Sequence, residues 1–124
     1  MPGIQHIMHN SALPNERYNE LLALMEGDRD LLRELIGVFL EDAPQRIEGV
    51  RRALADRDAE ALYKAGHALK GSAGNFGAAN VVSRAVRLEA LAKENDLEGA
   101  AAQFKSLVAD MDDLVGELIA ARNI

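Results

Sequence analysis

The C-terminal part of the chain carries the pattern that most restricts its fold. Between residues 97 and 118 the apolar positions alternate spacings of four and three without a slip. They are Leu97, Ala101, Phe104, Val108, Met111, Val115 and Leu118. This repeat is typical of a helix packed along its whole length against near-parallel helical neighbours. We therefore expect a long helix here, and partners that are helices too.

Earlier segments show the same helical spacing. A short helix beginning near Asn15 ends at Gly27, and Asp28 caps a long helix that reaches Leu54. Pro44 falls inside that long run, but its apolar stripe stays in phase, which predicts one kinked helix. Asp58 caps a third helix, predicted to run from about Ala59 to about Phe76. A fourth follows Gly77, with its inward positions at Val81, Ala85, Leu88 and Ala92.

Four long helices joined by tight turns predict an all-α fold, an antiparallel up-down-up-down four-helix bundle with a short additional N-terminal helix. Residues 1–14 lack periodicity and are expected to form a tail, so the domain is assigned to residues 15–124. Aromatic residues make up only 4%, which favours helices over strands. We expect a monomer, because the bundle closes its own core.

Charge and hydropathy exclude several classes of function. The net charge of −6 argues against a nucleic-acid partner, and no apolar run is long enough to span a membrane. The N-terminus does not resemble a secretory signal, so we expect a cytoplasmic protein. Residues 44–93 hold nine Lys and Arg against five Asp and Glu, a local charge of +4. This positive region suits an acidic protein surface or a phosphate.

The stretch GHALKGSAGNFG, residues 66–77, places four glycines around His67. Helical rotation of about 100° per residue puts His67 some 160–180° from the apolar stripe of its helix, so it faces solvent. Lys64 and Lys70 share this outer face, and so do Gly71 and Gly74. Exposed helical glycines cost about 0.5–1 kcal/mol each relative to alanine. We interpret Gly71 and Gly74 as clearing space for a bulky anionic group beside the ring.

This segment resembles the signature of histidine-containing phosphotransfer (HPt) domains. HALKGSAGNFGA has the family's histidine, followed by lysine at +3 and glycine at +4. FLEDAPQRIEGVRRAL and RLEALAKEND are similar to the family's preceding and following segments. The resemblance covers about residues 20–118. Gly66, where alanine is commoner, and Asn95-Asp96, where Gly-Asp is common, are the two departures.

The resemblance implies a phosphorelay intermediate rather than an enzyme. His67 would be the phosphoacceptor through Nε2, Lys70 would hold phosphoryl oxygens, and Gly71 would leave room for the phosphoryl group and the partner's loop. Lys64 and Gly74 are expected to assist. The implied partners are response-regulator receiver domains or a hybrid sensor histidine kinase. The chain would need no cofactor of its own, since the receiver would bring the Asp and Mg²⁺ that phosphoryl transfer requires.

Three alternatives compete with this reading. A complete histidine kinase would need an ATP-binding domain, for which no motif is seen. A metal or haem bundle would use inward ligands, whereas His67 points outward, and His6 and His9 have ligand-like spacing only in the expected tail. A structural adaptor without phosphotransfer is the third. Under the favoured reading, we expect docking over the third and fourth helices and the adjoining part of the second.

Overall fold

The computed structural model describes residues 14–124, in which we find five helices and no strand. The expected all-helical class is confirmed. The helices are α2 (Pro14–Leu24), α3 (Arg29–Ala55), α4 (Ala59–Gly74), α5 (Ala79–Lys93) and α6 (Leu97–Arg122). Apart from Pro14, the first residue of α2, the predicted tail lies outside the described residues.

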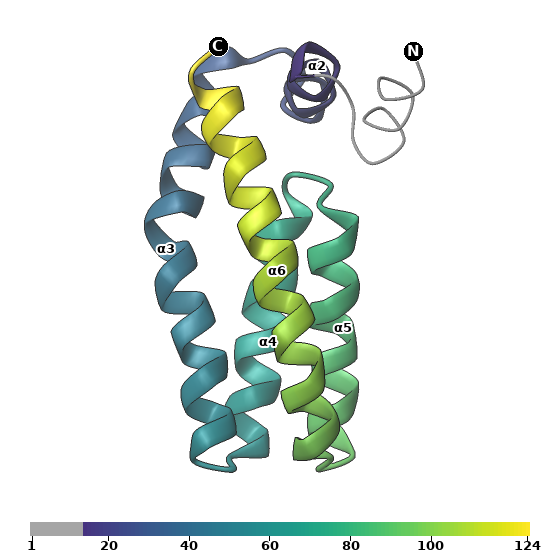
Figure 1. Cartoon of the computed structure of the whole chain (residues 1–124). Coiled ribbons are helices and arrows are strands. Elements are labelled where there is room, and N and C mark those ends of the chain that lie inside the picture. The colour runs from purple at the N-terminus through teal and green to yellow at the C-terminus, as the bar shows by residue number, and fades with distance from the viewer. Residues whose placement is uncertain (1–13) are drawn as a thin grey trace, which may run out of the picture.

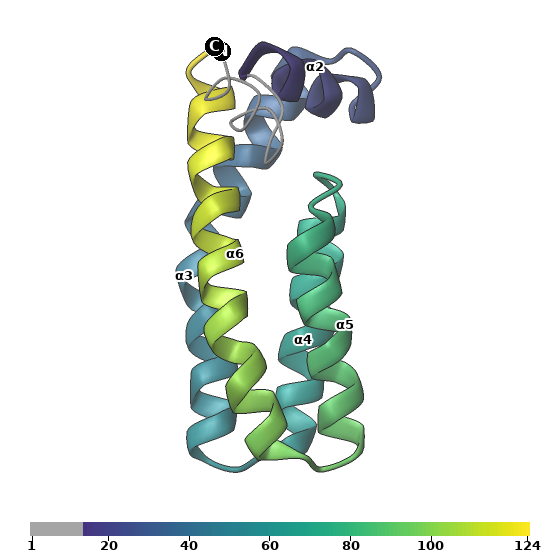
Figure 2. The ribbon, with the colours of Figure 1, turned by 45° about the vertical axis from the view of Figure 1, so that its right-hand side comes forward.

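The helices α3, α4, α5 and α6 lie side by side, and short turns join consecutive helices at alternate ends (Figure 1). Figure 2 shows α2 lying across one end of this group, beside the C-terminal end of α6. The most extensive packing is between α4 and α5, and α6 packs on both α5 and α3. The face of α4 that packs on neither α3 nor α5 is therefore available to carry a site.

Aspartate side chains cap the N-termini of three of the helices. Asp28 Oδ1 accepts a hydrogen bond from the backbone N–H of Leu31 at 2.9 Å, and Asp58 Oδ1 accepts one from Ala61 at 3.0 Å. Both predicted caps are confirmed, and each contributes about 1 kcal/mol. Asp96 caps α6 in the same way, through the N–H of Gly99.

The end of α4 differs from the prediction. The helix stops at Gly74, not near Phe76, and Asn75 is its C-cap. Gly77 instead lies in the α4–α5 turn with φ +59°, a left-handed conformation that favours glycine. The long α3 contains Pro44 as a single helix, as its unbroken stripe predicts.

The seam predicted along α6 is only partly right. Leu97, Met111 and Leu118 are buried, but Ala101 is exposed, and the other three predicted positions are half-buried. The buried residues of this helix are Leu97, Ala100, Leu107, Met111, Leu114, Leu118 and Ala121. The helix carries two neighbouring apolar rows, so spacing alone does not decide which faces the centre. The second row, with Val108 and Val115, lines a groove against α3.

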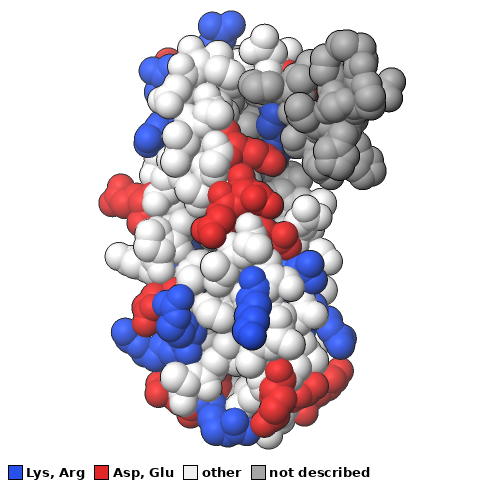
Figure 3. All heavy atoms as spheres, viewed as in Figure 1, with Lys and Arg blue, Asp and Glu red and all other residues white. Residues whose placement is uncertain are grey.

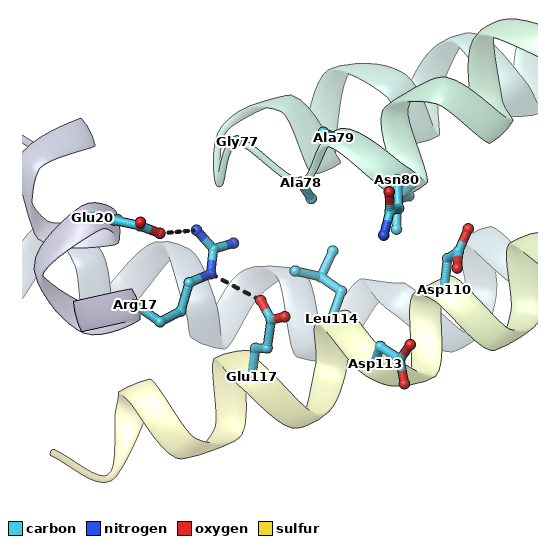
Figure 4. A pocket seen from close by; sticks show the side chains of 11 residues that line it. Arg17, Glu20, Gly77, Ala78, Ala79, Asn80, Asp110, Asp113, Leu114 and Glu117 are labelled. Carbon is cyan, nitrogen blue, oxygen red and sulfur yellow. Dashed lines mark hydrogen bonds and ion pairs between the residues drawn. The ribbon is translucent and has the colours of Figure 1, made fainter. Parts of the chain in front are cut away.

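An arginine fastens α2 to the end of the bundle. Arg17 Nε donates to Glu117 Oε1 at 2.9 Å, and Arg17 Nη2 donates to the carbonyl oxygen of Phe76 at 3.1 Å. Figure 4 shows Arg17 reaching between Glu20 and Glu117 at the edge of a pocket of about 250 Å³. One side chain thus connects α2, α6 and the α4–α5 turn.

No helix between residues 14 and 124 is both long enough and apolar enough to cross a membrane.

Candidate functional site

His67 lies on the outer face of α4. Its side chain is 63% exposed, whereas Leu62, Leu69 and Ala73 on the opposite side of the helix are buried. The outward orientation predicted from helical rotation is confirmed. In a neutral imidazole, one ring nitrogen carries a free lone pair and the other carries the proton.

A buried carboxylate on α5 holds the other side of this imidazole. Glu89 Oε2 lies 2.8 Å from His67 Nδ1, and Glu89 Oε1 lies 2.9 Å from Lys70 Nζ. Glu89 is the one charged residue buried within residues 14–124, with 7% of its surface exposed. No role for Glu89 is predicted from the sequence. Its position could have indicated one, because Glu89 lies next to Leu88 and near Ala92 in the inward row of α5, where a buried charge needs a partner.

Lys70 and His67 lower the pKa of the Glu89 carboxyl. Burial raises the pKa of the Glu89 carboxyl, but the hydrogen bonds and the electrostatic attraction from Lys70 and His67 together outweigh burial, so the net pKa lies below its ordinary value. The carboxylate is therefore ionised near neutral pH and can only accept hydrogen bonds. His67 Nδ1 must then carry the proton and donate it to Glu89. In the neutral ring this leaves the lone pair on Nε2.

The two lysines predicted beside His67 are both held by carboxylates. Lys70 is 36% exposed and pairs with Glu89, the same residue that binds the imidazole. Lys64 Nζ lies 3.4 Å from Glu60 Oε1, and both of these side chains are largely exposed. The structure therefore joins Lys70 to His67 through a shared carboxylate, while Lys64 belongs to a separate surface pair.

The glycines near His67 divide into two kinds. A Cβ added at Gly71 or Gly74 would meet nothing within 4 Å, so the fold does not require glycine at either position. The same is true of Gly37 and Gly49, so open space alone does not assign a role. At Gly66, which is buried, an added Cβ would lie 3.3 Å from the carbonyl oxygen of Ala85 on α5. Gly66 thus permits close approach of α4 and α5, and the clearance roles of Gly71 and Gly74 stay predictions.

Acidic side chains mark the face of the molecule on which α6 lies (Figure 3). In the view with α6 in front and α4 behind it, acidic side chains gather over α6 (Figure 3). No group of three or more His, Asp or Glu side chains within residues 14–124 is placed to hold a metal ion. The alternative metal site at His6 and His9 lies outside the described residues.

Comparison with known proteins assigns this sequence to a family. The family model described as Hpt domain matches residues 34–121, which include α4, α5 and most of α3 and α6. Comparisons with curated proteins and with solved structures gave no significant match.

Proposed function

Because the chain belongs to the Hpt domain family, we propose that it accepts a phosphoryl group on His67 from a receiver-domain aspartyl phosphate and passes it to another receiver. The family is one of histidine phosphotransfer modules in phosphorelays, not of kinase domains. The observation that carries the proposal is the exposed imidazole whose Nδ1 is bound by Glu89 at 2.8 Å. This contact leaves Nε2 free to act as the nucleophile.

The transfer step follows from that tautomer. The Nε2 lone pair forms a bond to the phosphorus atom, and the bond from phosphorus to the aspartyl oxygen breaks. The carboxylate of the donor leaves with that electron pair, and Nδ1 keeps its proton. The ring becomes cationic as the bond forms, and the buried carboxylate of Glu89 stabilises that charge. Glu89 is thus a positioning residue that also offsets the charge developing on His67.

The neighbouring residues take supporting roles in this proposal. Lys70 holds a phosphoryl oxygen once its contact with Glu89 loosens, and Gly71 leaves room for the incoming loop of the receiver. Gly74 and Lys64 assist at the margin of the site. The acidic residue and the Mg²⁺ ion needed for transfer belong to the receiver, which makes His67 a reactant entering a partner's site.

The partner surface is assigned to the helices on both sides of His67. Val38 on α3 is 52% exposed and, with Ser72, lines a pocket of about 200 Å³ between α3 and α4. Val86 on α5 is 47% exposed and lies three residues before Glu89, so both share one helical face. The two helices that pack on α4 thus each carry an exposed apolar side chain. This arrangement suits a docking surface with an apolar centre and a polar rim.

The proposal includes the architecture that would present this surface. We assign residues 15–124 to one monomeric, cytoplasmic domain with the antiparallel up-down-up-down arrangement of α3 to α6. Turns at alternate ends of consecutive helices support that arrangement (Figure 1). A hybrid sensor histidine kinase, whose own receiver would dock on the same face, is included among the donors.

The test is phosphotransfer to the intact chain and to His67→Gln. Phosphorylated receiver domains of the source organism are mixed with each protein, and acid-labile phosphate on the chain is measured. We expect transfer to the wild type from at least one receiver and none to His67→Gln. Labelling of His67→Gln would remove His67 as the acceptor. If no receiver labels the wild type, the structural adaptor is the better reading.

A further inference from the structure

A tyrosine and a third lysine extend the site beyond Glu89. Tyr63 lies one helical turn before His67 on α4, and their rings are nearly parallel, at 14°, with centroids 6.1 Å apart. Lys93 Nζ, from the last turn of α5, lies 5.3 Å from the centroid of the same Tyr63 ring. Tyr63 therefore contacts the imidazole on α4 and an ammonium group on α5.

The three lysines around His67 are bound with different strength. Lys70 pairs with the buried Glu89, and Lys64 pairs with Glu60. Lys93 forms no ion pair among the described residues, and its contact is with the face of Tyr63. Such a cation–π contact at an exposed site is worth only about 0.5–1 kcal/mol, so it restrains the ammonium without neutralising it.

A phosphoryl group on Nε2 brings a charge near −2 to this surface. Recruiting Lys70 would break its contact with Glu89 and leave that buried carboxylate with one partner fewer, which is costly. Recruiting Lys93 breaks no ion pair. Glu89 and Lys93 are four residues apart on α5 and share a face, and Glu89 already reaches the imidazole.

We propose that Lys93 is a second cation, in addition to Lys70, that meets the phosphoryl group on His67, and that Tyr63 is the positioning residue that restrains Lys93 on this face. The inference rests on the proposed function and adds Lys93 to the residues named there.

The phosphorylated protein allows a direct test that does not require a receiver. Phosphoramidate is used as a small-molecule donor, with His67→Gln as the unlabelled control, and ³¹P NMR follows loss of the phosphoryl group. In that reaction water attacks phosphorus, and Nε2 takes the electrons of the N–P bond. In a loose transition state, the phosphoryl oxygens carry less negative charge than they do in the phosphorylated ground state. A cation that contacts these oxygens therefore stabilises the ground state more than the transition state and slows the loss.

We expect Lys93→Met to lose its phosphoryl group about fivefold faster than the wild type, a factor corresponding to one exposed ammonium at close range. Lys93→Arg should restore most of the lifetime. Tyr63→Phe should behave as the wild type, because the ring face holds the ammonium. The rate of loss in Tyr63→Leu should lie between those of the wild type and Lys93→Met. Adding Lys93→Met to Tyr63→Leu should accelerate the loss by a smaller factor than Lys93→Met does in the wild type. Lys105→Met, on α6, is the matched control.

A second readout separates this role from a general effect on structure. The second ionisation of the bound phosphoryl group, followed by ³¹P shift against pH, should move to higher pH in Lys93→Met and not in Lys105→Met. Unchanged lifetime and ionisation in Lys93→Met, with both altered in Lys70→Met, would assign the phosphoryl cation to Lys70 and refute the inference alone. Failure of phosphoramidate to label His67 at all would overturn the proposed function and this inference together.

Discussion

Replacing Glu89 by glutamine tests how the carboxylate prepares His67. The amide has nearly the same size, but it has one accepting oxygen and one donating nitrogen where the carboxylate has two acceptors. Lys70 can only donate, so the amide oxygen turns to Lys70 Nζ, which lies 2.9 Å from a Glu89 oxygen in the native protein. The amide nitrogen then faces His67 Nδ1, which must accept. The ring proton moves to Nε2, and the nucleophilic lone pair is lost.

The size of this effect follows from the hydrogen bond that is reversed. A hydrogen bond to a charged group contributes about 1.5–3 kcal/mol, and each 1.4 kcal/mol is a factor of ten. We therefore expect Glu89→Gln to accept phosphate from phosphoramidate about ten- to hundredfold more slowly. The ¹⁵N shifts of the imidazole should show the proton on Nε2, and circular dichroism should show the helical fold intact.

A second substitution tests whether the imidazole tautomer causes the loss of reactivity. In Lys70→Met with Glu89→Gln, the amide is free to present its oxygen to Nδ1, so the double variant should react faster than Glu89→Gln alone. Glu60→Gln, which alters an exposed carboxylate paired with Lys64, is the matched control and should react normally. If the double variant is no faster than Glu89→Gln, the tautomer explanation is wrong. Wild-type reactivity of Glu89→Gln would exclude Glu89 from the chemistry altogether.

Other consequences can be measured in parallel. Leu69 is fully buried, so Leu69→Ala should lower the free energy of unfolding by about 2–5 kcal/mol in urea titrations. Arg17→Ala removes two hydrogen bonds to α6 and the α4–α5 turn and should cost about 1–2 kcal/mol, with faster amide exchange in α2. Because the pKa of Glu89 is lowered in the folded protein, its stabilising effect should be full above the ordinary carboxyl value and disappear as pH falls through the lowered value. The difference in unfolding free energy between wild type and Glu89→Gln should therefore shrink in acid; a constant difference would contradict the assignment. Gly71→Gln fits open space and should leave the fold intact but slow transfer from a receiver, while phosphoramidate labelling stays unchanged.

The helices were predictable because their signals are local. Asp28 and Asp58 cap helices where the sequence places them, and the apolar stripe carries α3 through Pro44. The register of α6 was not predictable in the same way. Two apolar rows lie next to each other on that helix, and the choice between them depends on where α3 and α5 pack, which spacing on α6 does not encode.

The candidate site shows the same division between local and tertiary information. The exposure of His67 follows from helical rotation within one segment, so the sequence predicts it. Its contact with Glu89 joins residues 22 positions apart on two helices. Lys64 and Lys70 share one outer face on the helical wheel, yet Lys70 is bound to Glu89 on α5, while Lys64 pairs with Glu60 on its own helix. Only the packing of α4 on α5 distinguishes them.

The packing of α4 on α5 also links Gly66 to the contact between His67 and Glu89, because Gly66 lies on the face of α4 that packs against α5. An added Cβ at Gly66 would lie 3.3 Å from the Ala85 carbonyl oxygen and 3.5 Å from Glu89 Cγ. The carbonyl belongs to helical backbone and cannot turn aside, so a larger residue must separate α4 from α5. We expect such a shift to lengthen the 2.8 Å contact between Glu89 and the imidazole. We therefore expect Gly66 to contribute to the orientation of His67 through the close approach of α4 and α5, whereas an added Cβ at Gly71 or Gly74 would meet only open space.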